Sequence, residues 1–209
     1  MKSRTKARGV ALQVLFEVDI ANHPVIPVMT ERLEDWLKDW LEESPEPTLY
    51  DACVKFEIVS KICTGSLSEE DFKDWLNRQI AEMTTEISRD ENLQLLEFFH
   101  LANFSRQITL GVLPMTTELD NFIAQHAPEW PLDQIAVIDR NILRIALWEF
   151  AVAECTPVKV AINEAIELAK IYGSDSTPRF VNGVLGSLAA RTQEIHQTFG
   201  KIKHSESEA

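Results

Sequence analysis

The chain has 209 residues, of which 7 are glycine and 9 are proline, and its formal net charge at pH 7 is −13. This length is enough for one large or two small domains with a full hydrophobic core, and the scarcity of turn-forming residues argues against a turn-rich all-β protein. The sequence contains no apolar run near the roughly 20 residues of a membrane-spanning helix, so we expect no membrane partner.

The chain opens with a basic arm that leads into a predicted amphipathic helix over residues 5–20. Its apolar residues recur at intervals of three and four and alternate with polar residues, unlike the apolar core of a signal peptide. At 100° per residue, Phe16 points away from the apolar stripe, where a single-stranded base could stack on it. Spacing alone favours a second interpretation, in which Phe16 is buried under another helix or a loop. The arm contains four bases and no acid: Lys2, Arg4, Lys6 and Arg8.

Residues 24–92 carry most of the negative charge, with 17 acidic and 7 basic side chains. We expect three amphipathic helices in this segment, over residues 32–43, over 49–63 and from Ser68 onward, where Ser68 and Asp71 resemble a capping box. Exposed charges are screened over about 8 Å at physiological salt. The basic arm can therefore bind an anion although the chain as a whole is acidic.

The central part of the chain predicts three further helices. One runs from about residue 90 to 111, a short one is capped by Thr117 and Asp120, and the third covers residues 133–150. The third is apolar on most faces, which is typical of a central helix in a bundle. Its polar edge is formed by Asp139, Arg140, Asn141, Arg144 and Glu149.

A helical pair follows near the C-terminal end, over about residues 157–173 and 178–189. Thr156 can cap the first helix, and Gly173 is expected to end it in a left-handed conformation, which glycine adopts without steric cost. In the second helix Gly183 and Gly186 lie three residues apart. They would let another helix backbone approach closely.

No stretch alternates with the period of two that a strand requires, so the predicted fold class is all-α. Glu164 and Glu167 lie one turn apart without a partner nucleophile, and we expect them on a solvated helix face. The tail, residues 191–209, has mixed charge and is expected to fray.

The sequence lacks a nucleotide-binding glycine loop, an HExxH motif and Cys–His ligand spacing. Its five histidines are scattered. We therefore expect no catalytic residue, no metal site, no cofactor and no enzymatic activity. The three cysteines form no CxxC pair, which is typical of reduced thiols in a cytoplasm.

Four sequence words, in order along the chain, resemble the transcription antitermination factor NusB family. They are ARGVALQVLF at 7–16, DRNILRIALWE at 139–149, VAINEAIELAK at 160–170 and FVNGVL at 180–185. The resemblance implies a compact helical bundle of two halves, with residues 1–190 as one domain. Residues 24–92 exceed what the family pattern places there, so we expect an acidic helical insertion within the N-terminal half. It also implies binding to boxA RNA with the small-subunit ribosomal protein NusE, within the RNA polymerase antitermination complex of ribosomal RNA operons.

The resemblance further assigns side chains to two surfaces. Basic side chains would contact phosphates, while aromatic and amide side chains would contact unstacked bases. The RNA-binding set is Lys2, Arg4, Lys6, Arg8, Gln13, Phe16, Ser176, Arg179 and Phe180. The set facing NusE is Asp139, Arg144 and Trp148, on or under one helix. Asn163, Asn182 and Gly183 would hold the C-terminal helix pair together.

Two departures from the family pattern leave alternatives open. The arm alternates bases with Ser3, Thr5 and Ala7, and the acidic segment is longer than expected. That segment could pack on the N-terminal half, mediate a dimer, or place carboxylates over the basic arm in competition with RNA. The runner-up function is a homodimeric interaction module without RNA binding, so either a monomer or a homodimer is expected. Kinship with the NusB-like front domain of ribosomal RNA methyltransferases is a third possibility, and no cofactor-binding α/β pattern supports it.

Overall fold

The computed structural model describes residues 3–41, 53, 57–82, 89–126, 134–191, 194–195 and 199, and all regular elements within these ranges are helical. The predicted all-α class is confirmed. The elements are α1 (Ser3–Ala21), α2 (Val25–Leu41), α4 (Ile58–Thr64), α5 (Glu69–Glu82), α6 (Arg89–Val112), the 3-10 turn η1 (Leu113–Met115), α7 (Thr116–His126), α8 (Val137–Leu147), the π-helical turn η3 (Trp148–Val152), α9 (Val158–Tyr172) and α10 (Thr177–Ala189).

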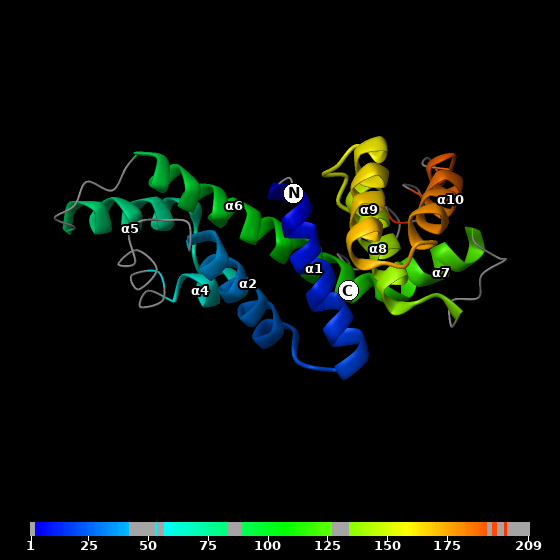
Figure 1. The fold of residues 1–209 in the computed structure, drawn as a ribbon, viewed down its shortest axis with the longest axis horizontal. Helices are drawn as coiled ribbons and strands as arrows, with labels where there is room; N and C mark the ends of the chain where they lie inside the picture. Colours follow the sequence, from blue (N-terminus) through cyan, green and yellow to red (C-terminus); the bar gives the residue numbers. More distant parts are fainter. Residues whose placement is uncertain are drawn as a thin grey trace, which may run out of the picture.

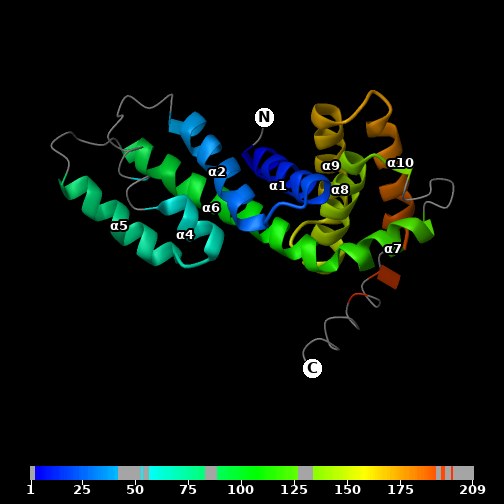
Figure 2. The ribbon, with the colours of Figure 1, turned by 90° about the horizontal axis from the view of Figure 1, so that it is seen from below.

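Helix α1 lies between two halves of the molecule. Helices α2, α4, α5 and most of α6 lie on one side of it, and α7 to α10 lie on the other (Figures 1 and 2). Successive apolar positions of α1 point into different cores: Ala7, Val10 and Val14 belong to the N-terminal core, whereas Leu12 and Leu15 belong to the C-terminal core. Because both flanks of α1 are covered, the helix is buried along most of residues 5–15.

The acidic segment contributes a core of its own against α1 and α6. Aromatic rings dominate this core: Trp36 meets Phe98 with ring centroids 5.3 Å apart, and Phe72 stacks on Phe99 at 4.6 Å. The predicted cap of α5 is confirmed, since the backbone N–H of residue 71 donates to the Ser68 hydroxyl over 3.1 Å. Of the helix expected over 49–63, residues 49–52 and 54–56 lie outside the described ranges, and α4 covers its end.

Several local predictions for the C-terminal half were wrong. Gly173 is extended (φ −92°, ψ −176°) instead of left-handed. Its lack of a side chain matters for space, because a Cβ there would lie 2.5 Å from the Thr177 Cβ. Thr156 does not cap α9, since its hydroxyl donates to Glu149 over 2.7 Å. The helix expected to start at Thr117 starts one residue earlier, at Thr116. Asp120 does not cap this helix, because its carboxylate accepts a hydrogen bond from Arg144.

The glycines of α10 do not mediate a close helix approach. Gly183 and Gly186 are exposed, and a Cβ at either position would meet nothing within 4 Å. Asn163 and Asn182 are exposed as well, so these signature residues face outward instead of joining the pair. Helix α10 packs through its opposite face, where larger side chains are buried: Val181, Val184, Leu185 and Leu188.

Part of the tail also departs from the expectation that it frays. Ile195 and Phe199 are buried in the C-terminal core, and the ring of Phe199 lies 5.7 Å from that of Phe122. The tail therefore covers the end of this core at those positions.

Candidate nucleic-acid interface

A buried ion-pair cluster fixes the N-terminal part of α1 to the C-terminal half. Arg8 donates from Nε and Nη2 to the Glu149 carboxylate, both over 2.8 Å, and from Nη1 to Glu164 over 2.9 Å. Thr5 donates to Glu164 over 2.7 Å. Burial disfavours the charged guanidinium, but the hydrogen bonds and charges of Glu149 and Glu164 outweigh it and raise the pKa of Arg8 above its ordinary value.

This arrangement corrects two expectations. The Arg8 side chain is only 3% exposed and all three of its donor nitrogens bind carboxylates, so it does not face a phosphate. Glu164 is not on a solvated face, because it accepts from α1, whereas Glu167 is exposed and pairs with Lys170 as a surface residue does. Arg8 therefore positions α1 instead of contacting RNA.

A second ion-pair cluster holds the C-terminal end of α1. Arg144 donates to Asp19 over 2.5 Å and twice to Asp120 over 2.6 Å, and Asn141 donates to Asp19 over 3.1 Å. The predicted polar edge, which spans α8 and η3, is thus partly buried: Asn141, Arg144 and Glu149 are all buried. The Arg144 side chain is 4% exposed, so it lies beneath the surface expected to face a protein partner.

Between these two clusters, α1 presents Gln13 and Phe16 outward. Phe16 is 38% exposed, so the interpretation that it is buried under another element was wrong. Gln13 is exposed and donates to the Tyr172 hydroxyl at the end of α9 over 3.4 Å. Gly9 allows this contact, because a Cβ there would lie 2.6 Å from the same hydroxyl.

The remaining cations of the arm face the N-terminal half. The guanidinium carbon of Arg4 lies 5.6 Å from the centre of the Phe104 ring on α6, and Nζ of Lys6 lies 5.7 Å from that of Trp36 on α2. Neither forms an ion pair with any of the described acidic residues. Lys2 lies outside the described ranges. The predicted RNA contacts are therefore split, with Arg4 toward α6, Lys6 toward α2 and Gln13 toward α9.

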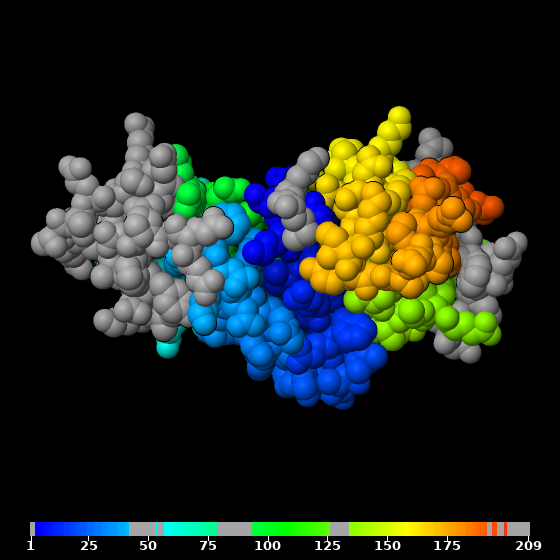
Figure 3. All heavy atoms as spheres, in the orientation of Figure 1, coloured from blue at the N-terminus to red at the C-terminus, as the bar shows by residue number. Residues whose placement is uncertain are grey.

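The other expected contacts lie in the turn between α9 and α10 and in the first turn of α10 (Figure 3, orange to the right of α1). Ser176 and Arg179 are exposed, and Phe180 is half-buried. Thr177 donates to the Asp139 carboxylate over 3.0 Å, which joins the start of α10 to α8. Burial raises the pKa of Asp139 above its ordinary value, and this hydrogen bond partly opposes the shift.

Trp148, the last residue assigned to a partner surface, packs against α6. It is half-buried, and a Cβ at Gly111 of α6 would lie 2.2 Å from its indole ring. The glycine therefore permits α6 to pass close to η3. Among the three residues expected to face NusE, Asp139 has a half-buried carboxylate near the surface.

The described residues contain no group of three or more histidine, cysteine, aspartate or glutamate side chains arranged to hold a metal ion. None of the described helices is both long and apolar enough to cross a bilayer.

Comparisons with known proteins agree with the motifs. The sequence model of the NusB family matches residues 55–190. The chain is 32% identical over 193 residues to the transcription antitermination protein NusB of Roseiflexus castenholzii, covering 91% of this chain and 94% of that protein. It is 48% identical over 85 residues to the protein of the same name from Bacillus pumilus, covering 41% of this chain and 65% of that protein. Among solved structures, T. maritima NusB matches with a TM-score of 0.52 at 19% identity, covering 93% of this chain and 90% of that one.

These alignments bear on the acidic segment. The Roseiflexus castenholzii protein aligns over nearly its whole length and nearly all of this chain, so the two are of similar size. The Bacillus pumilus protein is much shorter, because 85 aligned residues already make up 65% of it. The family match begins at residue 55, inside the segment expected as an insertion.

Proposed function

The chain belongs to the NusB family, and we propose that it is a non-enzymatic transcription antitermination factor that binds boxA-type single-stranded RNA together with the ribosomal protein NusE. In this role it would join the RNA polymerase antitermination complex in the bacterial cytoplasm and support read-through of ribosomal RNA operons. The observation that carries the proposal is the outward placement of Gln13 and Phe16 on a helix that buried ion pairs hold at both ends.

The exposed side chains of α1 have the chemistry that unstacked bases require. The ring of Phe16 offers a stacking face, and the Gln13 amide can hydrogen-bond a base edge through its carbonyl oxygen while its nitrogen donates to Tyr172. Because the flanking ion pairs hold α1 in place, this face needs little reorganisation to bind RNA. Ser176, Arg179 and Phe180 would flank the same strand from the turn that precedes and opens α10.

Phosphate contacts would come from Lys2, Arg4 and Lys6, with Arg8 as a positioning residue. Each phosphate contact to a single strand adds roughly −0.7 to the slope of log affinity against log salt. Three contacts give a slope of about −2, shallower than four would give. On the surface proposed to face NusE, Asp139 offers an acidic contact that suits a basic ribosomal protein. Trp148 and Arg144 would support the helix of Asp139 from beneath.

The test is fluorescence anisotropy with labelled boxA RNA and a scrambled RNA, using the native chain, Phe16→Ala and Leu93→Ala. Leu93 on α6 is also exposed, so its truncation controls for loss of apolar surface. Loss of one base stack costs about 1–3 kcal/mol, so Phe16→Ala should weaken boxA binding roughly 5- to 150-fold while Leu93→Ala changes little. Equal binding by all three proteins would refute the role of Phe16.

A homodimeric interaction module without RNA binding is the second candidate. The observation that favours it is a pair of exposed apolar side chains on α9, Val160 at 45% and Ile171 at 50%, eleven residues and hence three turns apart on one face. Light scattering would detect a dimer, and Val160→Ser/Ile171→Ser should then dissociate it. A monomer that binds boxA RNA would remove this candidate.

A further inference from the structure

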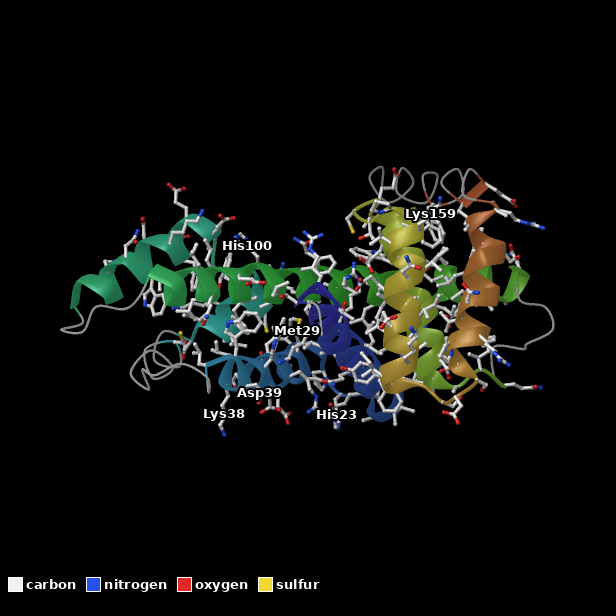
Figure 4. All side chains as sticks on the ribbon, turned by 45° about the horizontal axis from the view of Figure 1, so that its top comes forward. His23, Met29, Lys38, Asp39, His100 and Lys159 are labelled. Carbon is white, nitrogen blue, oxygen red and sulfur yellow. The ribbon has the colours of Figure 1, made fainter. Side chains whose placement is uncertain are left out.

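A cavity of about 500 Å³ lies beside the basic arm, on the side of α1 away from Tyr172. It is formed where the first turn of α1, the start of α5 and the middle of α6 meet. Figure 4 labels His100, which marks its place along α6. Small-molecule sites in proteins span about 300–1,000 Å³, so the cavity is large enough for one nucleotide. Its lining includes Arg4, Glu69, His100, Asn103, Phe104 and Gln107.

Arg4 supplies the feature of this cavity that suits a phosphate. Its guanidinium is held 5.6 Å from the Phe104 ring centre and forms no ion pair with the described carboxylates. A guanidinium on an aromatic ring keeps its in-plane N–H donors available for phosphate oxygens and its outer face available for a stacked base. Arg4 is exposed, so these groups are accessible.

Two amides from successive turns of α6 supply hydrogen-bonding groups. Asn103 donates from Nδ2 to the Phe99 carbonyl over 3.0 Å, which leaves its own carbonyl oxygen as an acceptor. Within the described residues, the Gln107 side chain has no hydrogen-bonding partner, and it is exposed. The two residues are four apart and therefore lie on the same face of α6. Amides placed in this way recognise base edges.

Glu69 adds a carboxylate to the cavity lining. Its carboxylate pairs with Lys73 and lies 3.8 Å from Nε2 of His100. A carboxylate repels a phosphate but accepts a hydrogen bond from an exocyclic amine, such as that of adenine, which uracil lacks. The cavity lining therefore offers both a cation for the phosphate and a carboxylate for an amino-bearing base.

We propose that this cavity binds one nucleotide, with its phosphate on Arg4 and its amino-bearing base among Asn103, Gln107 and Glu69. The nucleotide could belong to the bound RNA, where it would extend the strand beyond Phe16, or be a free mononucleotide. The first source rests on the proposed function. The second does not.

The experiment is a titration of the full ¹⁵N-labelled chain with AMP, UMP, adenosine and inorganic phosphate, followed through the side-chain amide signals of Asn103 and Gln107. AMP should shift both signals and bind more tightly than UMP, adenosine or phosphate alone. Gln107→Leu removes one hydrogen bond and should weaken AMP binding about fivefold. Gln125→Leu, at an exposed position on α7, is the matched control and should leave AMP affinity unchanged.

Addition of boxA RNA then separates the two sources. If RNA displaces AMP and shifts the same two signals, the nucleotide belongs to the RNA; if RNA binds and AMP remains, the site takes a free nucleotide. AMP binding without any RNA binding would refute the proposed function and keep the cavity site. RNA binding that depends on Phe16, with no shift of either amide signal by AMP or RNA, would overturn the cavity site and keep the proposed function.

Discussion

Replacement of Arg8 by methionine tests whether this residue positions α1 or binds RNA. The substitution keeps an apolar stem of similar length but leaves the Glu149 carboxylate, which is 1% exposed, with Thr156 as its remaining described hydrogen-bond donor. Removal of one partner from a buried ion pair typically costs about 3–5 kcal/mol, because the other charge remains buried. For a chain of this size that corresponds to a fall in melting temperature of roughly 6–20 °C.

Thermal and urea unfolding followed by circular dichroism would measure this cost. Arg8→Met/Glu149→Leu removes both buried charges and should recover at least half of the lost stability. Arg191→Gln is the control, because Arg191 is exposed and pairs with Glu194 at the surface, where such pairs contribute about 0–1 kcal/mol. If Arg8→Met cost no more than Arg191→Gln and only reduced the salt dependence of RNA binding, Arg8 would be a phosphate contact and the positioning role would be refuted.

Two further predictions concern titratable groups. Burial raises the pKa of Cys53 to about 12 and also raises that of Cys63, whereas Cys155 is exposed. A thiol reagent at about pH 8 should therefore label Cys155 alone in the folded chain. Rapid labelling of all three cysteines, measured by mass spectrometry, would contradict the packing. Burial raises the pKa of Asp139 in the folded state, so ionisation of this carboxyl destabilises the fold as pH rises through the raised value. Asp139→Asn should therefore be more stable than the native chain at pH 7, and the difference should vanish near pH 3; an unchanged difference between melting temperatures at the two pH values would count against this reasoning.

Local patterns predicted the elements well. Helical periodicity predicted the α1 helix, because apolar residues that recur at intervals of three and four, such as Ala7, Val10 and Val14, share a face that is buried whatever the partner is. The capping residue Ser68 was predictable for the same reason, since its hydrogen bond spans only three residues. Such features depend on neighbours in the sequence and need no knowledge of the fold.

The interactions that position the candidate site could not be predicted in this way. Arg8 and Glu149 are 141 residues apart, and a charged side chain by itself indicates a surface position. The same holds for Arg144, whose partner Asp19 lies 125 residues away. Gly173 was assigned from a general preference of helix ends, while its actual constraint is the nearby Thr177 side chain. The sequence therefore predicted candidate contacts, but it assigned to RNA or to a protein partner two arginines, Arg8 and Arg144, that form buried ion pairs within the fold.

The resemblance assigned all four basic side chains of the arm to RNA phosphates. Among the described residues of the arm, Arg8 is ion-paired, whereas Arg4 and Lys6 form no ion pair. The affinity of such a surface should be modest without help. A partner protein that supplies further positive charge would therefore matter more for this chain than the number of arm bases alone suggests.

The measurement that tests the central claim most directly is a salt titration of binding to boxA RNA and a scrambled RNA, with and without NusE. We predict sequence-dependent binding that NusE strengthens, with a slope of about −2 for the chain alone. Equal and negligible binding to both RNAs, even in the presence of NusE, would contradict the proposed function while leaving the fold and the family membership intact.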